Sequence, residues 1–179
     1  MWSVGNEEWA IENNETGTRI ARTMCEYCNR MDSTRMASAG NAGGTELIKG
    51  LQLIGYNYIV QNDIEGFRAT HPTSLAVGSE ETTGCGSRGV YFTDKAMGVK
   101  ASINRTPDKP GYMNVIERGW KFYDERDWLG GLFYWTGFDY RGEPNPLAWP
   151  ATGSLFGLLD YCGFAKDEAY YLKSWWTDE

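Results

Sequence analysis

The segments MWSVGNEE (residues 1–8) and LAVGSEETTG (residues 75–84) decide the fold of this chain. Each is a run of strand-forming, mostly apolar residues that ends in a carboxylate, Glu7 in the first segment and Glu80 in the second. A parallel strand that is buried on both faces reads as such a continuous apolar run. Because α/β barrels place their functional side chains at the C-terminal ends of their strands, both carboxylates are expected at one mouth of a barrel.

Further strand-like runs recur along the chain, and helical patterns lie between them. The expected strands cover residues 2–6, 35–40, 51–60, 74–80 and 130–140. The expected helices cover residues 16–31, 112–128 and 167–176. Strands that alternate with helices predict βαβ units and a parallel sheet.

The number of strands is too small for a complete barrel. A (β/α)8 barrel has eight strands and about 250 residues, whereas this chain has 179. The predicted fold class is therefore α/β, a partial TIM (β/α)8 barrel of roughly strands 4 to 8 with their helices. We expect residues 1–179 to form the C-terminal portion of a single catalytic barrel domain, as a fragment truncated at both ends.

The composition excludes several classes of partner. The formal net charge is -7 and the sequence contains no basic cluster, so nucleic acid is not an expected partner. No run approaches the ~18 apolar residues of a membrane-spanning helix, so no membrane association is expected. The 8 Trp and 11 Tyr residues suit surfaces that stack on sugars, although large core side chains account for most of them.

Two short motifs resemble binding sites that their surroundings do not support. Cys25 and Cys28 form a C-x-x-C, but the pair lies within a helical pattern, no second C-x-x-C follows, and His71 is the only histidine. The sequence therefore predicts no metal site and no redox centre. The segment GCGSRG (residues 84–89) matches G-x-G-x-x-G, but no helix pattern follows it, so nucleotide binding is not expected.

Carboxylates on two different strands are the minimum apparatus for hydrolysing a glycosidic bond. Glu7 could protonate a leaving oxygen while Asn6 binds a sugar hydroxyl, although a solvated, helix-capping acid is the simpler interpretation of an Asn-Glu pair. Glu80 and Glu81 are both candidates for a nucleophile. Because side chains alternate along a strand, only one of the two can face the pocket, and spacing does not choose between them.

Two aromatic residues lie at the ends of other expected strands. Tyr58, in GYNY, could hydrogen-bond the nucleophile, or it could be a half-buried residue of the sheet. Trp135, in FYWTGFDY, could pack against the apolar face of a sugar, or it could lie in the core. Asp139 and Arg141 could bind sugar hydroxyls, or they could pair with each other.

Eight segments, taken in order and spacing, resemble glycoside hydrolase family 2, and bacterial β-galactosidases in particular: WSVGNE, GYNY, VGSE, RGVY, GLFYWTGFDYRGEP, WP, FGLLDYCGFAKD and YYLKSWW. The resemblance covers essentially the whole chain. It implies that Glu7 is the general acid/base and that Glu80, rather than Glu81, is the nucleophile. It also implies that three further residues bind substrate or support the nucleophile: Asn6, Tyr58 and Trp135.

The resemblance implies a retaining β-glycosidase that hydrolyses terminal β-galactosides by double displacement, with no cofactor. Some members of the family bind magnesium near the acid, but their other ligands lie upstream of the segment matched here, so no metal is expected. The Asn-x-Lys motif of the family's β-glucuronidases is not matched, since Lys166 in GFAKD has no asparagine two residues before it. β-Glucuronidase or β-mannosidase activity, or an inactive structural or carbohydrate-binding fragment, is the alternative. The expected partners are a β-galactoside or related glycan and the remaining domains of the parent chain. Because the first barrel strands are missing, the isolated fragment is expected to be inactive.

Overall fold

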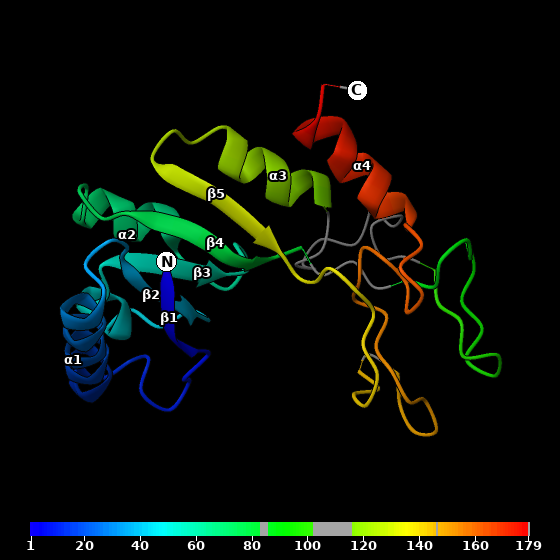
Figure 1. The fold of residues 1–179 in the computed structure, drawn as a ribbon, viewed down its shortest axis with the longest axis horizontal. Helices are drawn as coiled ribbons and strands as arrows, with labels where there is room; N and C mark the ends of the chain where they lie inside the picture. Colours follow the sequence, from blue (N-terminus) through cyan, green and yellow to red (C-terminus); the bar gives the residue numbers. More distant parts are fainter. Residues whose placement is uncertain (83–85, 102–115, 146, 179) are drawn as a thin grey trace. The chain divides into compact units, whose positions relative to one another are not determined.

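The structure is a computed structural model that describes residues 1–82, 86–101, 116–145 and 147–178 (Figure 1). The chain divides into two compact units. The first consists of Met1–Glu81 and Trp120–Phe133, and the second of Thr82–Gly119 and Tyr134–Glu179. No helix among the described residues combines the length and the apolarity that crossing a membrane requires.

The first unit is built on a five-stranded sheet (Figure 1). Its strands are β1 (Trp2–Asn6), β2 (Ala37–Asn41), β3 (Leu53–Asn57), β4 (Ala76–Glu81) and β5 (Leu129–Tyr134). They lie in the order β1-β2-β3-β4-β5, and the pairs β1–β2, β2–β3 and β3–β4 are parallel. Neighbouring strands that follow one another in sequence, with helices between them, are the arrangement of a (β/α)8 barrel. The predicted α/β class and partial barrel are thus confirmed.

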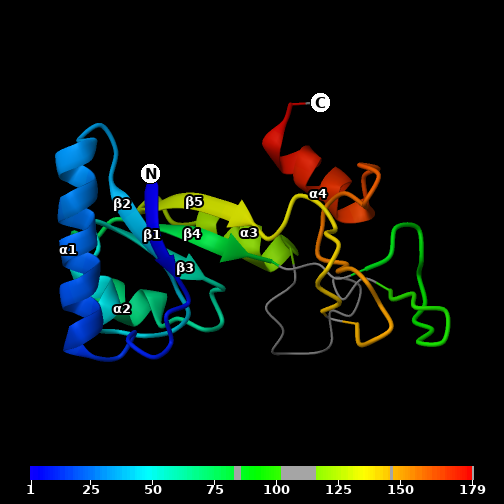
Figure 2. The same cartoon turned by 60° about the horizontal axis from the view of Figure 1, so that its bottom comes forward.

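Helices connect the strands. The connecting elements are α1 (Glu15–Met31) after β1, the 3-10 helix η1 (Leu47–Gly50) after β2, α2 (Ile64–Thr70) after β3 and α3 (Ile116–Asp124) before β5. Asn14 caps α1, because its side-chain oxygen accepts a 3.2 Å hydrogen bond from the Gly17 backbone N–H. α1 packs against β1 and β2 (Figure 2). The remaining helix, α4 (Asp167–Trp176), belongs to the second unit.

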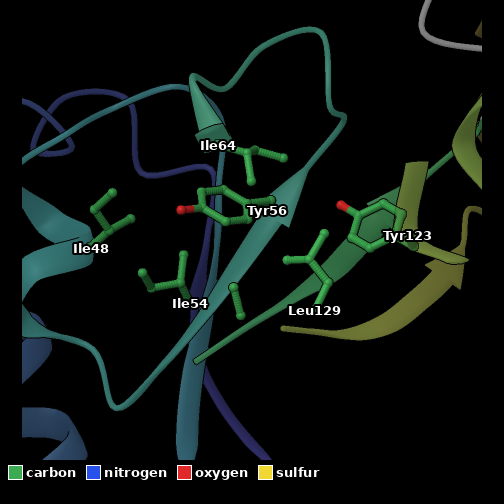
Figure 3. Packing of buried hydrophobic residues seen from close by; sticks show 7 residues of the cluster. Ile48, Ile54, Tyr56, Ile64, Tyr123 and Leu129 are labelled. Atoms are coloured by element: carbon green, nitrogen blue, oxygen red, sulfur yellow. The ribbon is translucent and has the colours of Figure 1, made fainter. Parts of the chain in front are cut away.

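Buried side chains hold these helices on one face of the sheet. The larger cluster is formed by residues from β3, β4, β5, α2, α3 and η1, namely Ile48, Ile54, Tyr56, Ile64, Ala76, Tyr123 and Leu129 (Figure 3). Because side chains alternate along a strand, β3 points Tyr56 into this cluster and Asn57 to the opposite face. The face opposite the helices therefore carries the polar end of β3.

The observed elements differ from the predicted ones mainly at their ends. The strand predicted over 51–60 ends at Asn57, because Tyr58 has a φ of 59° and a left-handed residue cannot continue a strand. The strand predicted over 130–140 ends at Tyr134, although its apolar run continues. The helices predicted over 16–31 and 167–176 match α1 and α4. Residues 112–115 of the third predicted helix lie outside the described residues, and α3 ends before Trp128.

Candidate active site

Polar residues end four neighbouring strands of the sheet. β1, β2 and β3 each end in an asparagine (Asn6, Asn41 and Asn57), and β4 ends in Glu80 and Glu81. Parallel strands bring their carboxyl ends to the same edge, which is where α/β folds bind ligands. Four of the five residues predicted for the site, Asn6, Glu7, Tyr58 and Glu80, lie at this edge.

Two of these residues leave their strands in a left-handed conformation. Glu7 directly follows β1 with a φ of 52°, and Tyr58 directly follows β3 with a φ of 59°. Each turn is held to the neighbouring strand, since Glu7 N donates to Gly40 O (2.9 Å) and Tyr58 N donates to Glu80 O (2.7 Å). Such a conformation costs about 1–2 kcal/mol for a residue with a Cβ atom, and local strain of this kind is concentrated at functional sites.

The left-handed turns allow consecutive side chains to reach the same place. In a regular strand, neighbours point to opposite faces. Here the side chains of Asn6 and Glu7 both contact Nδ2 of Asn57, and Asn57 and Tyr58 both contact the Glu80 carboxylate. The turns after β1 and β3 thus concentrate polar groups at one point of the sheet edge.

Asn57 is the centre of this cluster and is fully buried. Its Nδ2 lies 2.9 Å from Asn6 Oδ1, 3.1 Å from Glu7 Oε1 and 3.3 Å from Glu80 Oε2. The two N–H donors of the amide are therefore shared among three acceptors. The amide orientation is fixed by Ser79, whose hydroxyl donates to Asn57 Oδ1 at 2.7 Å.

A single nitrogen in contact with both carboxylates limits their separation. Two hydrogen bonds to one donor atom place their acceptor oxygens at most about 6.5 Å apart. Glu7 and Glu80 therefore form a close carboxylate pair supplied by β1 and β4. The pair has the residue types and proximity that acid/base and nucleophilic chemistry on a glycosidic bond requires.

Burial raises the pKa of Glu80 above its ordinary value, the Tyr58 hydrogen bond lowers it, and the nearby Glu7 charge raises it. The Tyr58 hydroxyl donates to Glu80 Oε1 at 2.6 Å, and Tyr58 itself is buried. Hydrogen bonding to a charged form favours that form. Tyr58 is thus the group that opposes protonation of Glu80.

Glu81 lies on the other face of β4 from this cluster. It is fully buried, and its Oε1 accepts hydrogen bonds from the Ile59 backbone N–H and from the Tyr123 hydroxyl (3.3 Å). Tyr123 is a member of the buried core. The alternation along β4 therefore brings Glu80, and not Glu81, into contact with Asn57 and Tyr58.

Trp135 belongs to the second unit, and the structure describes it within that unit. Its side chain is 38% exposed, and its ring meets the Tyr140 ring edge to face with centroids 6.5 Å apart. It is thus not a core residue of its unit. Its role as a sugar platform stays a prediction.

Asp139 and Arg141 do not pair with each other, contrary to one of the two expectations for them. Asp139 Oδ1 instead accepts from Lys166 Nζ at 2.7 Å, and both side chains are buried. The pKa of Asp139 is raised by burial, while the Lys166 ammonium opposes the shift. Arg141 lies over the Tyr161 ring, 5.5 Å from its centroid. The lysine meets the aspartate because bridges between 138 and 159, and between 159 and 165, bring the two segments together.

The cysteine motif lies on a helix, as expected. Cys25 is buried in α1 and Cys28 is partly buried, and both are free thiols. Across the described ranges, no group of three or more His, Cys, Asp or Glu side chains is placed to hold a metal ion. Residues 84 and 85 of GCGSRG lie outside the described residues, and no helix starts in the described residues after it, up to residue 101.

Sequence reasoning missed Asn57, the residue that joins the site. The available signal was the repeated asparagine at the ends of successive strands, which includes Asn6 and Asn41. The role of Ser79 was missed as well, because nothing in the segment VGSE shows that its hydroxyl contacts Asn57. Both residues act through side-chain contacts that only the paired strands reveal.

The parallel sheet carries a polar cluster at the carboxyl ends of its strands, which is where α/β barrel enzymes place their active sites. The chain therefore has the architecture of part of such a barrel. No family model matches the chain. A β-galactosidase of Bacteroides ovatus, BoGH2A, is 28% identical over the whole chain, which spans 27% of that protein. A putative β-glucuronidase of Formosa agariphila is 27% identical, also over the whole chain, which spans 19% of it.

Solved structures agree with these relatives. A glycosyl hydrolase family 2 member from Bacteroides cellulosilyticus matches 99% of the chain with a TM-score of 0.68 and 22% identity, and the match covers 19% of that structure. The resemblance to glycoside hydrolase family 2 is therefore confirmed, and the match covers only a fragment of each of these proteins. The chain spans about a quarter or less of the curated relatives that it matches.

Proposed function

We propose that this chain carries the two catalytic carboxylates of a retaining β-glycosidase that hydrolyses terminal β-galactosides. The observation that carries the proposal is the contact of one buried amide, Asn57 Nδ2, with both Glu7 and Glu80. Retaining enzymes need carboxyl groups about 5–5.5 Å apart, whereas inverting enzymes leave about 6.5–9.5 Å for a water molecule. The close pair favours the retaining arrangement.

The reaction proceeds in two displacements. In the first, a Glu80 oxygen forms a bond to the anomeric carbon while the bond to the leaving oxygen breaks, and Glu7 gives its proton to that oxygen. In the second, Glu7 takes a proton from water, the water oxygen attacks the anomeric carbon, and Glu80 leaves as a carboxylate. The configuration at the anomeric carbon is retained because it is inverted twice.

The surroundings support these separate roles. The Tyr58 hydroxyl donates to Glu80 and favours the ionised form that a nucleophile needs. Asn6, adjacent to Glu7, is the proposed partner of the sugar 2-hydroxyl, and its side chain is already oriented by Asn57. Trp135 is the proposed platform for the apolar face of the sugar.

The proposed sugar is galactose. One relative is named a β-galactosidase, and another a putative β-glucuronidase. Lys166 is the lysine that was compared above with the Asn-x-Lys motif of the β-glucuronidases, which it does not match. It is buried, and its Nζ donates to Asp139 and to Leu155 O (3.1 Å). An ammonium held in this way is not presented to a sugar carboxylate, which favours a neutral sugar.

We further propose that residues 1–179 supply the C-terminal part of one barrel domain, with a β-galactoside and the rest of the parent chain as partners. The proposal is supported by the order of the five strands, which follow one another in the sheet as consecutive strands of an eight-stranded barrel would. Substrate-binding groups from the other strands are needed to complete the pocket. Activity is therefore a property of the complete barrel.

The decisive experiment treats the protein that carries this chain in a complete barrel with an activated 2-fluoro-β-galactoside, followed by peptide mass spectrometry. A glycosyl adduct on Glu80 is expected, and E80Q is the control that should form none. An adduct only with the glucuronide or mannoside analogue would keep the mechanism and replace the sugar. The absence of any adduct would favour a binding or structural role instead.

A second measurement tests the role of Glu7. An acid is needed for poor leaving groups and is dispensable for good ones. E7Q is therefore expected to lose about 10²–10⁴-fold in kcat on an alkyl galactoside and to form the glycosyl-enzyme readily from a dinitrophenyl galactoside. Equal losses on both substrates would contradict the assignment of Glu7 as acid.

A further inference from the structure

The backbone turn at Tyr58 is unfavourable for a residue with a Cβ atom, so neighbouring groups must hold it. We infer that Asn62 and Glu81 are positioning residues that fix this turn and thereby hold the Tyr58 hydroxyl on Glu80. The inference rests on the proposed function for its catalytic consequence. The contacts themselves belong to the first unit.

Asn62 holds the carbonyl side of the turn. Its Nδ2 donates to Asn57 O at 2.8 Å and to Tyr58 O at 3.1 Å. It also lies 3.3 Å from Asn41 O, so the two N–H donors of this side-chain amide are shared among three backbone carbonyls. The side chain therefore fixes the orientation of two successive backbone carbonyls, that of Asn57 and that of the left-handed residue Tyr58 itself.

Asn62 is itself fixed by a buried partner. Asn41 Nδ2 donates to Asn62 Oδ1 at 2.9 Å and to Gly44 O at 3.0 Å, and Asn41 is fully buried. The Gly44 N–H donates in turn to the buried carboxylate of Glu12 (3.1 Å). The hydrogen bonds that hold the Tyr58 turn thus extend through Asn41 and Gly44 to Glu12, which lies in the loop after Glu7. The same hydrogen-bond network therefore supports the backbone near both Glu7 and Glu80.

Glu81 holds the amide side of the turn. Its Oε1 accepts from the Ile59 backbone N–H and from the Tyr123 hydroxyl, and the carboxyl group is fully buried. Glu80 therefore contacts Tyr58 directly, and Glu81 contacts the residue that follows it. Glu80 accepts from its hydroxyl and its backbone N–H, whereas Glu81 binds the next residue along the chain.

The test is a double-mutant cycle in the complete barrel, with N62A, Y58F and the combined variant. N62A is expected to lower kcat about tenfold with a smaller change in KM, and to add almost nothing in the Y58F background, because both changes remove the same interaction. N14A is the control: it loses the α1 cap and some stability, but it is expected to leave kcat unchanged.

A second readout does not depend on turnover. The titration of Glu80 is followed by carbon-13 NMR of glutamate-labelled protein, with its signal assigned by its loss in E80Q. Removal of the Tyr58 bond raises the pKa of Glu80, so the titration curve is expected to move to higher pH in Y58F and N62A. E81Q, which keeps an acceptor oxygen for Ile59, is expected to behave as wild type, whereas E81A should resemble N62A.

The outcomes separate the two proposals. A wild-type protein that hydrolyses no glycoside would end the proposed function, while the NMR titration would still decide whether Asn62 positions Tyr58. A titration curve of N62A that coincides with that of wild type would overturn the positioning role. Additive losses of kcat in the double variant would overturn it as well.

Discussion

The Tyr58 hydroxyl lies 2.6 Å from Oε1 of Glu80 and donates a hydrogen bond to it. The two residues come from different strands, because Tyr58 follows β3 and Glu80 lies in the last part of β4. The same tyrosine also donates its backbone N–H to the Glu80 carbonyl (2.7 Å). One residue therefore fixes both the main chain and the side chain of the proposed nucleophile. Burial raises the pKa of Glu80, and the hydroxyl acts against that rise.

Y58F is expected to shift the acidic limb of the kcat/KM profile to higher pH. Loss of the donor raises the pKa of Glu80, so a smaller fraction of the enzyme is ionised at low pH. A hydrogen bond to a charged group contributes about 1.5–3 kcal/mol, which corresponds to a loss of about 10–150-fold in kcat/KM. A pH series of initial rates measures both effects, and an unmoved limb would contradict the role of Tyr58.

N57D is expected to be more damaging than N57A. The aspartate would place a third carboxylate between Glu7 and Glu80, where the amide now donates hydrogen bonds. N57A removes the donor and should cost about 1–3 kcal/mol, because polar partners are left unsatisfied. Chemical denaturation and kcat/KM are measured for both variants. Equal effects would show that the added negative charge does no further harm beyond the loss of the amide donor.

G40A is expected to disrupt the site through packing alone. A Cβ atom on Gly40 would overlap Asn6 Oδ1 and would lie 2.7 Å from Asn57 Oδ1. Overpacking of this kind costs about 1–3 kcal/mol and should displace Asn57 from the carboxylates. G5A is the matched control on β1, since its Cβ would make only ordinary contacts of 3.6 Å or more. Thermal unfolding and kcat/KM should change in G40A and remain close to wild type in G5A.

E80Q is expected to be more stable than wild type at neutral pH while losing turnover. The pKa of Glu80 is higher in the folded state than its ordinary value of 4.5, so the folded state binds this proton more tightly than the unfolded state. The associated stability is present below pH 4.5 and is lost as the pH rises through the folded-state pKa. The gain in Tm should therefore be seen at pH 7 and should shrink below pH 4.5.

The matched control for that comparison is E8Q, because Glu8 is exposed and follows Glu7 directly in the sequence. Its Tm is expected to follow wild type at both pH values. A lower Tm for E80Q than for wild type at pH 7 would show that the hydrogen bonds of the carboxylate outweigh its desolvation.

The sheet and the edge that carries the site could be predicted from the sequence, because buried parallel strands have a strong apolar signal and end in polar residues. Strand alternation also correctly predicted that only one of Glu80 and Glu81 faces the site, but it could not predict which one. The same rule fails for Asn6 and Glu7, whose side chains converge. A left-handed turn at a non-glycine residue has no sequence signature, so this convergence could not be foreseen.

The roles of single polar residues were equally hidden. Asp139 and Arg141 are two residues apart and of opposite charge, yet Asp139 pairs with Lys166, which is 27 residues away. Asn57 lies within GYNY next to Tyr58, and nothing in that segment distinguishes it. In both cases the partner is chosen by packing between distant segments, which local pattern does not record.

The hydrogen bonds of Asn57 join residues that are 51, 50 and 23 positions apart in the sequence. Contacts between such distant positions form slowly during folding, because long loops must close before the contacts can stabilise anything. No helix or hairpin can assemble the carboxylate pair in advance. Regained turnover during refolding would therefore report the completed pairing of β1, β3 and β4, and would lag behind the recovery of helical signal.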